Sequence, residues 1–244
     1  MKENKIIKDC IHICKNLIRY KKYIEDNHVN IALIPPALLD PDILLNVDLL
    51  VVGGEKISQS VLQSYLNAKI NVLNAYGPTE ATVISSYHLF RETSEYNNIG
   101  LPIKNTHYYV LDKHLELAKN EEIGELYIGG LGLARGYVQK TALHKSFFIE
   151  HPSLGRLYKT GDLIRVTVDG AYGYIGRSDR QVKIRSHRIE LGEIESVIHL
   201  FPGINHCIVI TDSILEKANH PSSLILAYFV SDIEIDQQQL KLFV

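Results

Sequence analysis

The sequence predicts an α/β protein with a parallel sheet, then an antiparallel β subdomain, then a small and truncated α+β domain. Three observations predict this order. Apolar runs of helical and strand length alternate up to about residue 95, short strand-like runs follow up to residue 175, and a strand–helix–strand pattern begins again after Gly176. The chain has 244 residues, 45% of them hydrophobic, which is enough for one large domain and a smaller one.

The N-terminal elements alternate between helix and strand. We expect a helix over 6–27, strands over 29–34, 49–52 and 70–73, and a further helix that starts after Ser58. Ser58 is a residue type that favours the N-cap position. A strand–helix–strand crossover is right-handed, which makes strands 49–52 and 70–73 parallel. Gly53-Gly54-Glu55 and Asn74–Glu80 therefore emerge at the carboxyl edge of one sheet, where open parallel sheets bind ligands.

The later elements are mostly short strands. We expect strands over 107–111, 125–128, 163–168 and 171–175. Asp169-Gly170 is the signal of a two-residue hairpin between the last two. Val182 and Ile184 then alternate with charged residues, and a helical stripe runs from Leu191 to Phe201. Strands are expected over 207–210 and 224–230, and a helix that Asp236 opens. The domain boundary is expected at Arg177–Arg180.

Composition excludes several classes of function. A net charge of −2 gives no electrostatic case for binding nucleic acid, and the basic run from Lys183 to Arg188 is typical of a solvated face. Three cysteines without a CxxC pair indicate a reducing compartment. The N-terminus lacks the apolar core of a signal peptide, and no window approaches 18 uninterrupted apolar residues. We therefore expect a cytoplasmic protein without a membrane partner.

Five segments occur in a fixed order. They are VVGGE at 51–55, NAYGPTE at 74–80, GELYIGGLGLARGY at 124–137, YKTGDL at 158–163 and GRSDRQVKIR at 176–185, which runs into RIELGEIE. Together they resemble the second half of an adenylation domain of a nonribosomal peptide synthetase (NRPS), in the adenylate-forming superfamily, from about residue 20 onward. The resemblance implies that residues 1–177 are the C-terminal portion of the large core domain. It also implies that residues 178–244 are an incomplete small C-terminal domain.

This family activates a carboxylate with ATP, releases pyrophosphate, and transfers the acyl group to the phosphopantetheine thiol of a carrier protein. Two anions must meet in the first step, so the site needs a metal ion, donors to phosphate and a fixed nucleotide position. The resemblance therefore implies ATP or AMP and Mg²⁺ as cofactors. It implies an amino-acid substrate and a carrier protein as partners.

The resemblance also assigns roles to single residues. Thr79 would bind phosphate oxygens and Glu80 would hold Mg²⁺, which suits a hydroxyl and a carboxylate. Asp162 would accept both ribose hydroxyls, and Arg177 would reach the ribose and the phosphate. Asp179 matches the hinge about which the small domain rotates. The nucleotide set is Gly54, Glu55, Asn74 at the adenine edge, Tyr76 stacked on adenine, Gly77, Thr79, Asp162 and Arg177, and the catalytic residues are Thr79, Glu80 and Arg177.

Other interpretations of these residues stay open in the sequence. Thr79 and Glu80 can instead cap the next helix after a Gly-Pro turn, and Asp162 can cap a turn. Arg177 and Asp179 can belong to surface ion pairs. The segment GELYIGGLGLARGY is spaced GxGxxxG among strand-like residues, which argues against dinucleotide binding. In the family it is structural, and we assign it no chemistry.

The acyl pocket is expected from alignment to the family. Its positions fall on Val51, Gly53, Ala75, Val83 and Ile84, with Leu33 as a less certain sixth. Their small or aliphatic side chains imply an apolar or mid-sized amino-acid side chain. The alternative interpretation is that Val51, Val83 and Ile84 are plain core residues.

Three groups that the chemistry needs do not occur in this sequence. No phosphate loop of the TSGTTGxPKG type is present, nor the C-terminal lysine motif, nor the upstream aspartate for the substrate ammonium. Ser186 also stands where the family has glycine. Losing one charge-assisted contact in the transition state costs about 3–4 kcal/mol. We expect little activity from this chain alone, with three interpretations open: part of an amino-acid ligase that a complementing chain completes, an acyl-CoA ligase of the same superfamily, or a catalytically silent nucleotide-binding fragment.

Overall fold

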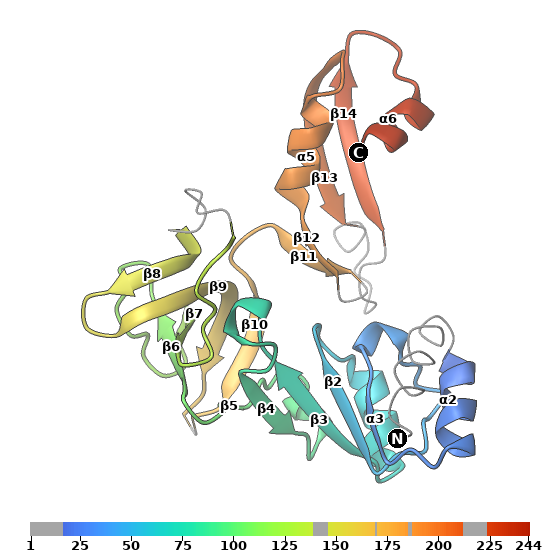
Figure 1. Ribbon diagram of the computed structural model, residues 1–244, viewed down its shortest axis with the longest axis vertical. Helices are drawn as coiled ribbons and strands as arrows, with labels where there is room; N and C mark the ends of the chain where they lie inside the picture. The colour runs from blue at the N-terminus through green and yellow to red at the C-terminus, as the bar shows by residue number, and fades with distance from the viewer. Residues whose placement is uncertain (1–16, 139–145, 169, 185–186, 212–223) are drawn as a thin grey trace. The chain divides into compact units, whose positions relative to one another are not determined.

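The computed structural model describes residues 17–138, 146–168, 170–184, 187–211 and 224–244. The chain forms two compact units, Met1–Ser178 and Asp179–Val244. The predicted mixed α/β architecture is confirmed, with a sheet that contains parallel strands and with antiparallel sheets besides it (Figure 1). Ser186, Asp169 and the first part of the helix expected over 6–27 lie outside the described residues.

The first sheet has five strands in the order β1-β2-β3-β4-β5. Its strands are β1 Ile31–Leu33, β2 Leu49–Gly53, β3 Asn71–Tyr76, β4 Ser86–Leu89 and β5 Leu101–Pro102. β2 and β3 are parallel, as the strand–helix–strand pattern predicts, and β1 is parallel to β2 as well, while β4 and β5 are antiparallel to their neighbours. The strand expected over 29–34 is shorter, at Ile31–Leu33, and the strand expected over 70–73 continues to Tyr76. Asn74, Ala75 and Tyr76 therefore lie on the strand itself and not beyond its end, as the expected bounds had them.

Two helices cover one face of this sheet. α2 spans Leu17–Asp26 and α3 spans Gln59–Asn67. The predicted N-cap is confirmed, because the Ser58 side chain accepts a hydrogen bond from Val61 N at 3.3 Å. Ile24 of α2 and Leu62 of α3 share one core with the inward residues of the strands. Leu50, Val52 and Val72 are those inward residues, and none of them is exposed to solvent.

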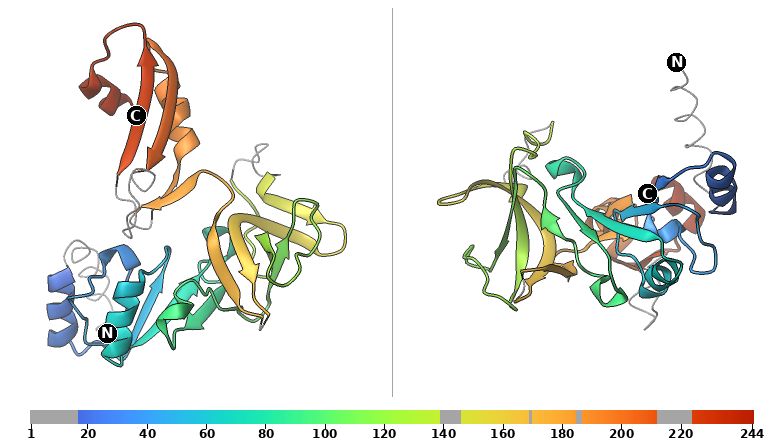
Figure 2. Two further views of the ribbon diagram at one scale, coloured as in Figure 1. Left: turned by 180° about the vertical axis from the view of Figure 1, so that it is seen from behind. Right: turned by 90° about the horizontal axis from the view of Figure 1, so that it is seen from below.

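The second sheet is antiparallel and belongs to the same unit. Its order is β10-β9-β7-β6, with β8 paired to β9. Its strands are β6 Thr106–Leu111, β7 Ile123–Gly130, β8 Phe148–His151, β9 Gly155–Val166 and β10 Tyr172–Arg177. In Figure 2 its green and yellow strands form a body of their own beside the blue-to-teal strands of the first sheet. β9 is much longer than the predicted strand 163–168, so the segment YKTGDL lies inside a strand.

The hairpin between β9 and β10 also differs from the prediction. Thr167 N donates to Ala171 O at 2.9 Å, so the connection is residues 168–170 and not two residues. Gly170 adopts a positive φ of 83° and donates from its N to Thr167 O at 2.9 Å. A glycine with positive φ at the third position is typical of three-residue hairpins, which explains why Asp-Gly misled the sequence interpretation.

The described residues of the second unit form two strand pairs and two helices. They are β11 Gln181–Ile184 with β12 His187–Glu190, helix α5 Leu191–His199, β13 Ile204–Thr211 with β14 Ile225–Ser231, and helix α6 Gln237–Phe243. The predicted start of the last helix is confirmed, because Asp236 accepts from Gln238 N at 2.8 Å. Leu191, Val209 and Leu240 form the core. Among the described helices of both units, none is long and apolar enough to cross a membrane.

Candidate functional site

The segment NAYGPTE joins a strand to a tight return loop. β3 ends at Tyr76, and a single 3₁₀ turn, Thr79–Ala81, follows the Gly-Pro pair. Ser85 N donates to Tyr76 O at 2.8 Å and closes the loop. A Cβ atom on Gly77 would lie 2.6 Å from the carbonyl oxygen of Val83, so only glycine fits at this close approach. The loop therefore fixes the positions of Tyr76 and Thr79 relative to each other.

Tyr76, Asp162 and Arg177 form one connected cluster. The Tyr76 hydroxyl donates to Asp162 Oδ2, and Arg177 Nη1 donates to Asp162 Oδ1 at 2.9 Å. The Asp162 and Arg177 side chains are 5% and 11% exposed, so this ion pair is buried. The structure thus brings together three residues that the sequence had assigned to the nucleotide. It also shows that the Arg177–Asp162 pair is not a surface pair and that Asp162 does not cap a turn.

The register of β9 and β10 explains the ion pair. Arg177 lies directly opposite Asp162 across the two strands. The register shifts between Tyr174 and Gly176, where one extra residue on β10 forms a bulge. Without that shift Gly176 would face Asp162. A bulge next to a candidate site is a common device for re-aiming a side chain.

Tyr76 is held as a neutral donor. Burial, and then the nearby Asp162 carboxylate, raise the pKa of Tyr76 well above its usual value. Its ring packs edge-on against Tyr108, with 6.4 Å between centroids. The Tyr108 and Ser85 hydroxyls are 2.6 Å apart, and burial raises the pKa of Tyr108 to about 12. The hydroxyl of Tyr76 is therefore fixed on the carboxylate, while stacking of its ring on adenine stays a prediction.

Glu80 is the second anchor of the candidate site. Its side chain is buried, and Oε1 accepts a hydrogen bond of 2.5 Å from the Tyr137 hydroxyl. Its main-chain oxygen accepts from Ala134 N at 2.8 Å. Burial, and then the bond to Glu80, raise the pKa of Tyr137, so this tyrosine is a neutral donor. Thr79, by contrast, is exposed at the start of the 3₁₀ turn.

The sequence interpretation missed Tyr137. It assigned no chemistry to the segment GELYIGGLGLARGY, yet two residues of that segment contact the predicted metal ligand. No periodicity links positions 80 and 137, so only the resemblance of the segment as a whole pointed toward the site. Thr82 Oγ1 also donates to Gly132 O at 2.6 Å, so the segment contacts the loop beside Glu80 as well.

The residues present fit a Mg²⁺ ion that arrives with phosphate. Within the described ranges, no group of three or more His, Cys, Asp or Glu side chains is arranged to hold a metal ion. Mg²⁺ bound with nucleotides uses one or two protein carboxylates and takes its other ligands from phosphates and water. Glu80, a single buried carboxylate held by a neutral donor, suits that ligand set.

Other predicted nucleotide and hinge residues make contacts of their own. Glu55 Oε1 accepts from Ala37 N at 3.0 Å, and Asn74 Nδ2 donates to Asn98 O at 2.9 Å. Gly54 follows β2 with a positive φ of 85°. Asp179 Oδ1 accepts from Gln181 N at 3.1 Å at the start of the second unit. The roles of Glu55 and Asn74 toward the nucleotide and of Asp179 as a hinge therefore stay predictions.

The predicted pocket residues Val51, Gly53 and Ala75 share one face of the first sheet. Cross-strand pairing puts Leu33 beside Val51 and Gly53 beside Ala75. A Cβ on Gly53 would lie 2.5 Å from Ala75 O, so this position needs glycine. Side-chain alternation puts Tyr76 on the opposite face from Ala75. Val83, in the return loop, is 68% exposed, so its interpretation as a core residue was wrong.

This face carries apolar side chains, several of which are exposed to solvent in the described part of the chain. We call it the open face and define it by Ile31, Leu33, Leu49, Val51, Leu73, Ala75, Tyr87 and Leu101. Ile31, Leu33, Tyr87 and Leu101 are each 56–65% exposed. A parallel sheet normally has helices on both faces. The open face is therefore unusual, because the two helices α2 and α3 cover only the other face.

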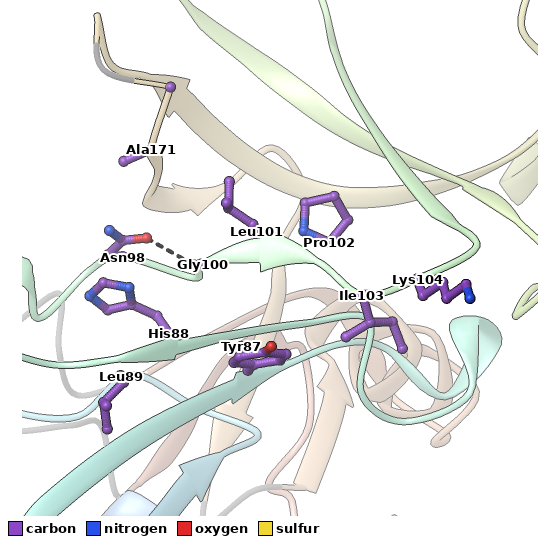
Figure 3. Close-up of a pocket in the computed structure, with 11 residues that line it drawn as sticks. Tyr87, His88, Leu89, Asn98, Gly100, Leu101, Pro102, Ile103, Lys104 and Ala171 are labelled. Atoms are coloured by element: carbon purple, nitrogen blue, oxygen red, sulfur yellow. Dashed lines mark hydrogen bonds between the residues drawn. The ribbon is translucent and has the colours of Figure 1, made fainter.

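A groove lies along the β4–β5 end of this sheet (Figure 3). Its volume is about 530 Å³. It is lined by Tyr87, His88, Leu89, Asn98, Gly100, Leu101, Pro102, Ile103, Lys104, Gly170 and Ala171. None of the predicted site residues is among them, but Tyr87 and Leu101 belong to the open face. The groove is thus part of the surface next to the open face and separate from the Asp162 cluster.

Comparison with known proteins identifies the family that this chain resembles. Residues 14–138 match the family of AMP-binding enzymes. Gramicidin S synthase 1 of Brevibacillus brevis is 36% identical over 246 residues, which cover 98% of this chain and 22% of that protein. Tyrocidine synthase 2 of Brevibacillus parabrevis is 37% identical over 205 residues, which cover 82% of this chain and 6% of that protein. The chain spans less than a quarter of either relative.

Solved structures show the same likeness. PA1221, an NRPS protein containing adenylation and PCP domains, matches in its holo form bound to a vinylsulfonamide inhibitor. The TM-score is 0.80 at 28% identity, over 92% of this chain and 41% of that chain. AB3403, a four-domain NRPS bound to AMP and glycine, matches at 34% identity and a TM-score of 0.63, over 94% of this chain and 18% of that chain. The chain therefore belongs to the AMP-binding enzyme family, as part of an adenylation domain of the nonribosomal peptide synthetase type.

Proposed function

We propose that this chain supplies the nucleotide-binding part of an amino-acid-activating site, and that a second polypeptide segment covers its open face to complete the enzyme. In the proposed reaction an oxygen of the amino-acid carboxylate attacks the α-phosphorus of ATP, and the bond to pyrophosphate breaks. The phosphopantetheine sulfur of a carrier protein then attacks the carbonyl carbon of the aminoacyl-adenylate, a thioester forms as the thiol proton is lost, and AMP leaves. The similarity to gramicidin S and tyrocidine synthases and to the PCP-containing neighbour supports these substrates and this partner.

Each anchored residue has a place in this proposal. Asp162 orients the ribose, because each carboxylate oxygen can accept a second hydrogen bond beside the one from Tyr76 or Arg177. Arg177 holds the Asp162 carboxylate in place through its hydrogen bond of 2.9 Å and adds positive charge near the nucleotide. Thr79 donates to phosphate oxygens from its exposed position. Glu80 would hold Mg²⁺, which supplies charge neutralisation for the phosphates.

The open face carries the proposal of a complementing segment. Val51, Gly53 and Ala75, the predicted acyl-pocket residues, lie on this face among exposed apolar neighbours. A pocket on one open sheet face cannot exclude water or enclose an aliphatic side chain. Contiguous exposed apolar surface also favours association. The solved neighbour PA1221 carries more than twice the matched length, so further chain exists in that relative.

We expect the chain alone to be a poor catalyst. These 244 residues contain no TSGTTGxPKG-type loop and no lysine motif of the family's C-terminal type, so they do not by themselves supply those donors to the β- and γ-phosphates and to the carboxylate. The experiment is amino-acid-dependent exchange of labelled pyrophosphate into ATP. We expect no exchange by the chain alone. We expect exchange when it is co-expressed with a segment that contains the phosphate loop, taken from the adenylation domain of gramicidin S synthase 1.

Two outcomes contradict this proposal. Exchange by the chain alone at the rate of a complete domain would show that no further segment is needed. If the two polypeptides do not co-purify, the complementing segment does not dock on the open face. A parallel assay of transfer to coenzyme A tests the acyl-CoA ligase alternative, and transfer to coenzyme A but not to a carrier protein would replace the amino-acid ligase proposal.

A further inference from the structure

We propose that Tyr137 is a positioning residue for Glu80: its hydroxyl fixes the carboxylate in the orientation that receives Mg²⁺ and nucleotide phosphate. This inference rests on the proposed function, because the metal-binding role of Glu80 comes from it. The structure supplies the geometry. Tyr137 OH donates to Glu80 Oε1 at 2.5 Å, and the Glu80 side chain is buried. A short hydrogen bond to an ionised acceptor is among the stronger kinds.

Glu80 is held by its main chain as well as by its side chain. Ala134 N donates to Glu80 O at 2.8 Å, three residues before Tyr137 in the same segment. Gly132 O accepts from Thr82 Oγ1 at 2.6 Å on the other side of the 3₁₀ turn. Three contacts from residues 132–137 therefore hold Glu80, in the 3₁₀ turn, and Thr82, directly after it. The segment acts as a support for Glu80, which gives a function to a motif that the sequence interpretation left without one.

The support is itself fastened to the second sheet. Arg156 of β9 donates from Nη2 to Ala134 O at 2.8 Å, and its guanidinium lies over the Phe148 ring at 4.7 Å. The Tyr137 ring makes edge-to-face contacts with Phe147 and Phe148, with centroids 6.3 and 5.7 Å apart. An aromatic ring packed in this way has few rotamers, so its hydroxyl has a defined position. The donor is thus preorganised before any ligand binds.

A hydrogen-bond donor fixed on one oxygen of Glu80 affects how tightly that carboxylate binds a metal ion. Outer partners that hold a ligating carboxylate set its orientation, and their loss typically weakens metal binding by about 10- to 100-fold. If Tyr137 served only to fill space, phenylalanine would replace it without effect on the metal. The two roles therefore predict different results for the same conservative variant.

The experiment is a calorimetric titration of the 244-residue chain with a nonhydrolysable ATP analogue, with and without Mg²⁺. For Tyr137→Phe we expect unchanged affinity for the analogue without Mg²⁺, and an apparent Mg²⁺ affinity weakened by about 10- to 100-fold in its presence. Tyr127→Phe is the matched control, since Tyr127 is a buried tyrosine of β7 that packs with Leu111 and Leu157. We expect the control to leave both affinities unchanged. Circular dichroism confirms that each variant is folded.

A double variant separates a specific loss of Mg²⁺ affinity from a general loss of folding. In a Glu80→Gln background, Tyr137→Phe should have no further effect on Mg²⁺ affinity, because the inferred effect of the hydroxyl on the metal passes through that carboxylate. Equal Mg²⁺ affinity of the Tyr137→Phe variant and the unmodified chain would overturn the inference while leaving the proposed function standing. No analogue binding by the unmodified chain, with or without Mg²⁺, would overturn the proposed function and this inference with it.

Discussion

Replacing Asp162 with alanine is expected to lower the free energy of unfolding by about 3–5 kcal/mol. Asp162 accepts from Tyr76 and from Arg177, and both members of the ion pair are almost fully buried. Removing the carboxylate leaves the guanidinium charge in a site that water hardly reaches, which is far more costly than losing a surface pair. Urea denaturation followed by circular dichroism measures the difference.

Two variants check this interpretation of the ion pair. Glu190→Ala removes one partner of the exposed Arg188–Glu190 pair, where the N–O distance is 3.4 Å, and should cost less than about 1 kcal/mol. Replacing both Asp162 and Arg177 with apolar residues of similar volume should recover much of the loss, because no buried charge then remains. If Asp162→Ala lowers the free energy of unfolding no more than Glu190→Ala does, the interpretation of Asp162 and Arg177 as a buried ion pair is wrong.

Leu33→Asp is expected to weaken association with the complementing segment by about 100-fold or more, while leaving this chain folded. Leu33 lies on the open face beside Val51 and is 65% exposed in the structure. Docking an apolar layer there would bury a carboxylate without a partner, which costs several kcal/mol. Co-purification and titration calorimetry with the phosphate-loop segment measure the effect.

The sequence offers a matched control for this variant. Leu117 is also 65% exposed, but it lies in the connection between β6 and β7, away from the open face. Leu117→Asp makes the same chemical change at the same exposure and should leave association intact. If both variants weaken association equally, the segment does not dock on the open face.

Local signals in the sequence predicted much of the fold. Ser58 and Asp236 mark helix starts through side-chain capping, which depends only on near neighbours. The parallel pairing of β2 and β3 follows from the helical crossover between them, which the sequence pattern shows. β9 was predicted too short because Thr160 and Asp162 are polar yet buried. Thr160 Oγ1 donates to Leu126 O at 2.7 Å, a tertiary bond that no period-2 pattern records.

The candidate site was predictable only in part. The resemblance pointed to Tyr76, Asp162 and Arg177, and the structure brings these three together. Their contact depends on a bulge in β10, which an alternating pattern does not reveal. Tyr137 reaches Glu80 from 57 positions away in the chain. Contacts between residues so far apart in the chain depend on how strands and loops pack, and the spacing of residues in the sequence does not predict them.

The acyl pocket stays a prediction, and residue type alone does not place its members. Val51 and Val83 have the same side chain, but one lies on a strand and the other is 68% exposed with a positive φ of 66°. A β-branched residue rarely adopts that conformation, so the residue type carries no warning of it. Propensity alone would place both valines in strands.

The most direct test of the central claim is calorimetric titration of the chain with a nonhydrolysable aminoacyl-adenylate analogue. We expect micromolar binding by the unmodified chain and at least about 100-fold weaker binding by Asp162→Asn, since two hydrogen bonds to a charged acceptor are lost. Glu150→Gln, an exposed carboxylate on β8 of the same sheet, should bind as the unmodified chain does. Absence of binding by the folded, unmodified chain would contradict the claim that it holds a working nucleotide half-site.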